Sequence, residues 1–141
     1  MPSAAERLVA QWKREKVALN AGATEGELDE LRALFQFEVP EDIRSLYVLA
    51  NGMPDLVYDS HQVAFWSIAK ICDQRNGGWK DNEIGFADFL VYSWRFIFRP
   101  SGGLVTVVSE NVRPREPMKT LGRFADFLEQ YLSDPRSLGV H

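Results

Sequence analysis

The stretch from Phe37 to Asp55 constrains the fold more than any other part of the chain, because it contains both a helix start and an abrupt helix stop. Pro40 suits the first helical position, since proline has no amide hydrogen to lose there and its φ is already helical. Apolar residues then recur at the spacing of one helix face. These are Ile43, Leu46, Tyr47 and Ala50. Asn51 and Gly52 end the run, because glycine adopts the left-handed conformation of a helix C-cap without steric cost.

The size and composition are those of one folded domain, which we assign to residues 1–141. Of the 141 residues, 45% are hydrophobic and 26% are charged, which argues against disorder. The net charge of −4 argues against nucleic-acid binding, which needs a basic face. The single cysteine, Cys72, excludes an intramolecular disulfide and fits a reducing compartment. With no apolar run of signal-peptide or membrane-helix type, we expect a soluble cytoplasmic protein that binds no membrane.

Helices are expected first along the chain. Ser3 and Glu6 form a capping-box pattern that opens a helix running to about Leu19. Thr24 and Glu27 repeat the pattern before a second helix, and the helix that begins at Pro40 is the third.

Strands are expected in the middle of the chain. Residues 90–98 show the clearest alternation of side chains between two faces, and a proline- and glycine-containing turn at 99–103 leads to a returning strand. That returning strand is predicted at 104–108. The other predicted elements are strands at 63–66 and 84–86, a brief helix capped by Ser67, a basic loop at 111–119 and a last helix capped by Thr120. The predicted fold class is therefore α+β, with N-terminal helices, a central mainly antiparallel β-sheet and a C-terminal helix packed on the sheet.

A search for catalytic or metal-binding residues finds no convincing group. A zinc site needs three or four fixed ligands, and the chain has one cysteine and two histidines, His61 and His141. No phosphate-binding glycine loop or nucleophile-elbow motif is present. Cys72 with His61 as its base is conceivable, but its place on the inward face of a short helix favours a core residue. We expect no catalytic residue, no metal and no cofactor.

Acidic residues crowd the region before the third helix, with seven between residues 25 and 42 and only Arg32 to balance them. They are Glu25, Glu27, Asp29, Glu30, Glu38, Glu41 and Asp42. A carboxylate-dependent hydrolase is one interpretation. The favoured one is that helix first turns carry acids because these stabilise the helix dipole.

Two loops are candidates for binding a protein partner. An aromatic residue in an acidic loop is a reasonable hot spot for a basic partner. The candidate residues are Asp55, Asp59, Trp79, Asp81 and Glu83. The alternative is that Trp79 only anchors its own loop to the sheet. A basic group of Arg113, Arg115, Lys119 and Arg123 is small and interrupted by Glu116, which favours a solvated loop over a nucleic-acid patch.

The segment VPEDIRSLYVLANGMPD resembles the signature of the SUKH superfamily, which combines a Val-Pro or Leu-Pro pair, an acid, an apolar helix and Asn-Gly. The segments FWSIAKI, IGFADF and RFADFLEQYL follow in the order typical of that family, so the resemblance covers nearly the whole chain. The motif positions are Pro40, Asn51 and Gly52, and their roles are architectural. Met53 is a departure, since many members have a further glycine there.

The resemblance implies an α+β fold and a protein-binding role without catalysis. The superfamily includes fungal cell-wall assembly regulators and bacterial immunity proteins that neutralise cognate toxins. The expected function is therefore an immunity protein whose partner is a toxin domain, such as a nuclease. The alternative is a regulatory protein-interaction module of the cell-wall assembly regulator type, and the outsider is the hydrolase.

Overall fold

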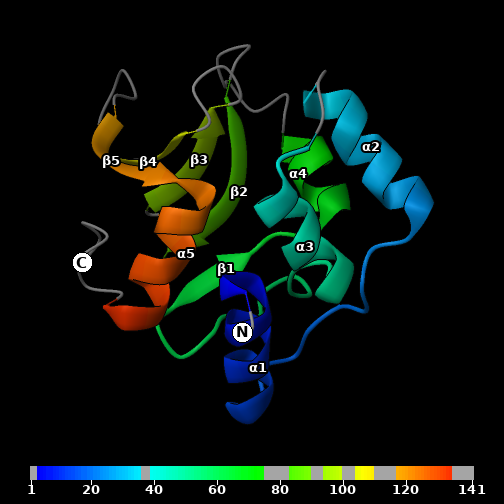
Figure 1. The fold of residues 1–141 in the computed structure, drawn as a ribbon, viewed down its shortest axis with the longest axis horizontal. Coiled ribbons are helices and arrows are strands. Elements are labelled where there is room, and N and C mark those ends of the chain that lie inside the picture. The colour runs from blue at the N-terminus through cyan, green and yellow to red at the C-terminus, as the bar shows by residue number, and fades with distance from the viewer. Residues whose placement is uncertain are drawn as a thin grey trace.

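The structure is a computed structural model that describes residues 3–35, 39–74, 83–89, 94–99, 104–109 and 117–134. Within these residues the helices are α1 (Ala4–Arg14), α2 (Glu25–Phe35), α3 (Glu41–Leu49), α4 (Ile68–Gln74) and α5 (Phe124–Ser133). The strands are β1 (Val63–Phe65), β2 (Ile84–Phe89), β3 (Trp94–Arg99), β4 (Leu104–Ser109) and β5 (Pro117–Arg123). Figure 1 shows α5 in front of the sheet, with α2, α3 and α4 grouped beside it.

The described strands form one antiparallel sheet in the order β1-β2-β3-β4-β5. Each strand pairs with its neighbour in sequence. The pairing of β2 with β3 is interrupted between Gly85 and Ala87, and that of β4 with β5 is interrupted at two places. Helices first, an antiparallel sheet and a final helix on that sheet make the fold α+β, which confirms the predicted class.

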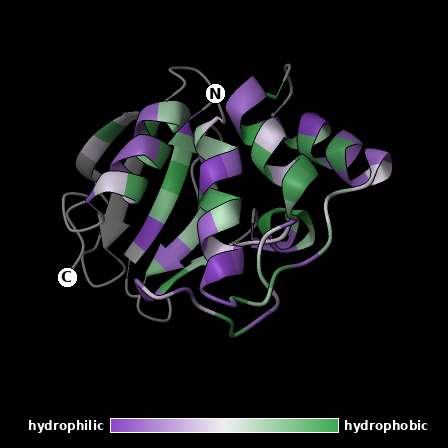
Figure 2. Ribbon diagram, turned by 60° about the horizontal axis from the view of Figure 1, so that its bottom comes forward, coloured by the Kyte–Doolittle hydropathy of each residue, from purple (hydrophilic) through white to green (hydrophobic). Residues whose placement is uncertain are grey.

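The core lies between α5 and one face of the sheet. The Phe127 ring of α5 lies 5.2 Å from the ring of Phe96 on β3 and 5.5 Å from that of Phe86 on β2, measured between centroids. α1 packs beside α5 and brings Trp12 to 4.9 Å from the ring of Phe65. Figure 2 shows hydrophobic and hydrophilic residues on different sides of these helices, as expected for helices that cover a core.

The first helix is shorter than predicted. The capping box of Ser3 and Glu6 is present, but α1 ends at Arg14 and not near Leu19. Lys16 has a left-handed φ of 59°, and the amide of Val17 donates to the carbonyl of Trp12 at 3.0 Å. This is a Schellman-type stop. It was missed because lysine, and not glycine, occupies the left-handed position.

The end of the sheet also differs from the prediction. Residues 117–123 form β5, where a loop to Lys119 and a helix cap at Thr120 were expected. Thr120 pairs with Thr106 of β4, and α5 begins only at Phe124. The backbone amide of Arg123 donates to the carboxylate of Asp126 at 3.1 Å, which satisfies one amide at the helix start. Of the strand predicted at 90–98, residues 94–98 belong to β3, and residues 90–93 lie outside the described residues.

The described helices were also compared with the length and hydropathy needed to cross a bilayer. None of those within the described ranges is both long enough and apolar enough to do so.

Candidate functional site

Asn51, which follows α3, connects the ends of three helices. Its side-chain oxygen accepts a hydrogen bond at 2.8 Å from the amide of Ile68, the first residue of α4. Its side-chain nitrogen donates at 2.8 Å to Glu27, whose other carboxylate oxygen accepts from the amide of Thr24 before α2. Asn51 is buried, so these bonds replace lost contacts with water. The residue therefore holds these helix ends together.

Gly52 is needed for a different reason than predicted. The C-cap of α3 is Ala50 in an extended conformation, and Gly52 lies two residues further on with φ of 66°. A Cβ atom on Gly52 would lie 2.4 Å from the carbonyl carbon of Trp66. The glycine thus permits close contact between two backbone segments. Pro40 is likewise shifted: it is the N-cap, and Glu41 is the first helical residue.

Trp66 stabilises this region through contacts of both its side chain and its backbone. Its ring nitrogen donates to the buried carboxylate of Asp88 at 2.6 Å, and its carbonyl accepts from the hydroxyl of Tyr47 at 2.8 Å. The ammonium of Lys70 lies 5.4 Å from the ring centroid, and the guanidinium of Arg95 lies 5.5 Å from it. Both distances are in the range of cation–π attraction, so the Lys70 side chain is held in one place.

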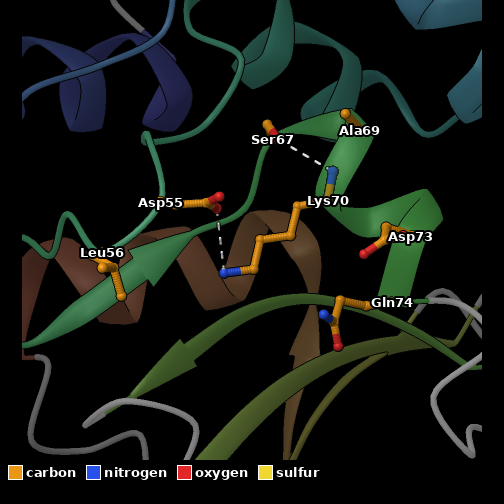
Figure 3. A pocket seen from close by; sticks show the side chains of 7 residues that line it. All are labelled: Asp55, Leu56, Ser67, Ala69, Lys70, Asp73 and Gln74. Atoms are coloured by element: carbon orange, nitrogen blue, oxygen red, sulfur yellow. Dashed lines mark hydrogen bonds and ion pairs between the residues drawn. The ribbon is translucent and has the colours of Figure 1, made fainter.

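An open cleft of about 660 Å³ lies between the turn at residues 54–56 and α4. Figure 3 shows the Lys70 side chain extending between Asp55 on one side and Asp73 on the other. The lining residues are Asp55, Leu56, Ser67, Ala69, Lys70, Asp73 and Gln74. The ammonium of Lys70 is 3.8 Å from Asp55, and the Lys70 side chain is 17% exposed while that of Asp55 is 84% exposed. This cleft is our candidate functional site.

Asp59 does not face a partner, which corrects the prediction. It is 4% exposed, and one carboxylate oxygen accepts from the amides of His61 and Val63 at 2.9 and 3.2 Å. The other oxygen accepts from the ring nitrogen of Trp12 at 3.1 Å and from the hydroxyl of Tyr131. Burial raises the pKa of the Asp59 carboxyl, and the hydrogen bonds from His61, Val63 and Trp12 oppose that rise. Asp59 therefore joins α1, β1 and α5 inside the protein.

Glu83 is also buried, at 7% exposed, so its carboxylate offers little surface to a partner. It accepts a hydrogen bond from the guanidinium of Arg99 at 2.7 Å, an ion pair that compensates for the lost hydration. Trp79 and Asp81 lie outside the described residues. Asp55 is thus the one predicted partner residue that the described part of the chain places in the cleft.

The sequence interpretation missed Lys70, Leu56, Asp73 and Gln74 as cleft residues. Lys70 follows Trp66 by four residues, and Trp66 itself lies two residues before α4. That signal is weak, because the spacing is common. Leu56 is a large apolar residue in an otherwise polar turn, and only its exposure of 80% makes it notable.

His61 and Cys72, the alternative catalytic pair from the sequence, both lie in the described part of the chain. His61 lies edge-on to the Tyr131 ring, with centroids 5.6 Å apart. Cys72 is half-buried at the edge of the core, and burial, with the charge of Glu30, raises the pKa of its thiol. Within the described ranges, no three histidine, cysteine or acidic side chains lie close enough to hold a metal ion.

The chain was also compared with known proteins. A scan against models of protein families finds no match for it, and a search of curated proteins finds no match either.

Proposed function

We propose that this chain is a non-catalytic protein-binding domain that acts as an immunity protein for a cognate bacterial toxin in the cytoplasm. The observation that carries the proposal is the open cleft beside α4, which borders the same segment that resembles the SUKH signature. Asp55 lies at the end of that segment and on the wall of the cleft.

The rigidity of the cleft supports a binding role. Its α4 wall is fixed by the hydrogen bond that the Ile68 amide donates to Asn51. The Lys70 side chain in the cleft lies over the Trp66 ring, which in turn donates to Asp88. A surface that is already ordered loses little conformational entropy on association, which favours affinity. Cleft walls with both charged and apolar side chains also suit recognition of another protein.

The hydrogen bonding of the buried Asp59 carboxyl supports a binding function over a catalytic one. Asp59 is the described carboxyl group whose pKa is raised, a property that general acids often share. Both of its oxygens already accept hydrogen bonds from groups within the protein. Such a carboxyl has a structural role.

The overall charge supports a basic partner. The net charge of −4 speeds association with a cationic protein by electrostatic steering. A toxin that acts on nucleic acid carries a basic surface, because it must neutralise phosphates. A nuclease toxin is therefore the partner class that this chain suits best.

The test is co-expression with the product of each neighbouring gene. We expect one of these products to be toxic alone, harmless with this protein present, and recovered with it as a stable complex. Two variants accompany this test. Asp55→Lys with Lys70→Glu changes the cleft and should weaken the complex. Glu41→Gln with Asp42→Asn on α3 is the control and should leave the complex intact. Failure to rescue cells from any neighbouring toxin, together with no complex, would overturn the proposal. A complex with a non-toxic protein would replace it with the regulatory-module alternative.

A further inference from the structure

We propose that the cleft beside α4 binds a basic side chain of the partner protein, preferably arginine, at the exposed carboxylate of Asp55, with Asp73 adding to the negative potential and an apolar neighbour of that side chain on Leu56. This inference rests on the proposed function, because it specifies the chemistry of the partner at the same site. It is drawn from the charge, exposure and position of the cleft residues.

The accessible charges of the cleft are negative. Asp55 and Asp73 are exposed, whereas the Lys70 side chain is mostly covered and lies over the Trp66 ring. Counting the charged lining residues, two negative and one positive, leaves a net charge of −1. A partner entering the cleft therefore meets acidic groups first, and a cation is favoured over an anion.

The Asp55 carboxylate has capacity for a second cation. One of its oxygens is 3.8 Å from the Lys70 ammonium, which is a long ion-pair distance. A carboxylate offers about four lone-pair positions, so most remain for a new donor. A guanidinium donates two parallel hydrogen bonds to a carboxylate, and an ammonium cannot match that geometry, which is why we favour arginine.

Leu56 supplies the apolar part of the site. It is 80% exposed, and a left-handed φ of 65° accompanies its position in the turn next to Asp55. Non-glycine residues rarely adopt such a φ. The side chain of Leu56 lines the cleft. The expected contact is an apolar side chain adjacent in sequence to the arginine.

The first experiment uses short probe peptides and the wild-type protein. The probes are acetyl-Leu-Arg-Leu-amide and its acidic counterpart acetyl-Leu-Glu-Leu-amide, titrated to about 10 mM while amide resonances are followed by NMR. We expect the arginine probe to shift the amides of Leu56, Ala69 and Asp73, with smaller shifts at higher salt. An equal response to the glutamate probe, or no response at these amides, would overturn the inference.

Variants then locate the charge that matters. Asp55→Asn with Asp73→Asn should weaken binding of the arginine probe about tenfold, because both exposed acidic groups are neutralised. Glu41→Gln with Asp42→Asn removes the same total charge from α3 and should leave the affinity within about twofold. Dispersed amide spectra verify folding of both proteins. Equal affinity of the two variants would contradict the assignment to the cleft.

The cognate complex separates this inference from the proposed function. If a neighbouring toxin binds the wild type and the Asp55→Asn, Asp73→Asn variant equally well, the function stands and the cleft assignment fails. If the arginine probe binds in the cleft but no neighbouring gene product forms a complex, the cleft chemistry stands and the immunity role fails.

Discussion

Both the backbone conformation of Gly52 and its contact with a distant segment require glycine at this position. Its φ of 66° is unfavourable for other residues, and a side chain there would overlap the backbone of Trp66 and Ser67. We predict that Gly52→Ala lowers the free energy of unfolding by about 3 kcal/mol or more, since the backbone at residue 52 must move away from that of Trp66 and Ser67. Urea denaturation followed by tryptophan fluorescence measures the change.

Gly26 in α2 provides the matched control for that substitution. A Cβ atom there would meet its nearest neighbour, the side-chain oxygen of Thr24, at 3.9 Å, which is ordinary contact. Alanine has the higher helix propensity, so Gly26→Ala should raise the free energy of unfolding by about 0.5–1 kcal/mol. Similar effects of the two substitutions would contradict the close approach at Gly52.

Asp59 gives a prediction about pH. Because burial raises its pKa above the usual 3.8, the folded protein retains this proton at pH values where the unfolded chain has lost it. Its contribution to stability is therefore complete below the unfolded pKa and is lost as the pH rises through the folded pKa. We expect the difference in unfolding free energy between the wild type and Asp59→Asn to decrease across that window.

Urea denaturation at a series of pH values from about 3.5 to about 7 tests this, with Asp42→Asn as an exposed control. The carboxyl carbon shift of Asp59 measured by NMR gives the folded pKa directly. A difference that grows with pH, or a folded pKa below 3.8, would show that the hydrogen bonds outweigh burial.

At the scale of the element, the C-terminus of α1 depends on one residue in an unfavourable backbone conformation. Lys16 has a left-handed φ of 59°, and the two Schellman hydrogen bonds of Lys16 and Val17 close the last turn. We predict that Lys16→Gly stabilises the protein by about 1 kcal/mol, because glycine adopts this conformation without a Cβ clash. Thermal and urea unfolding would measure it.

The control for this helix end is Lys13→Gly in the last turn of α1. Lys13 is also exposed, but it has helical geometry, so glycine there should destabilise by about 1 kcal/mol. The two substitutions, three residues apart, are therefore expected to change the free energy of unfolding in opposite directions. Loss of stability in both variants would indicate that Lys16 contributes through its side chain.

At the scale of the whole molecule, Phe127 joins the last helix to the sheet. Its ring centroid lies within 6.1 Å of five other aromatic rings. These belong to Phe65, Phe86, Phe96, Phe124 and Tyr131. We predict that Phe127→Ala costs about 3–5 kcal/mol, because it removes buried surface and leaves a cavity between α5 and the sheet.

Leu132→Ala is the comparison, since this residue lies on the same helix but is only partly buried. Its cost should be clearly smaller, because part of its surface remains in water in either case. Urea denaturation of both variants tests the ranking. An equal cost would mean that the aromatic cluster adds little beyond the general packing of α5.

Local features were predictable at the level of single turns. The capping boxes at Ser3 and Thr24 and the Ser67 start of α4 depend on residues up to four positions apart. The strand β3 was predicted from a period of two, although Ile97 is buried together with Phe96 and Phe98. The α+β class follows from the order of these elements. The candidate site was predicted only in part, because Asp55 alone among the described partner candidates is both exposed and in the cleft.

The sequence by itself thus determined where most helices and strands lie, through short-range contacts that need no knowledge of the fold. Only the tertiary structure decided which polar residues are buried. The donors to Asp59 from Trp12 and Tyr131 lie 47 and 72 residues away in the chain. The same holds for Gly52, whose close neighbour is the backbone of Trp66. Burial and close approach depend on which distant segments fold against one another, and no local pattern encodes that.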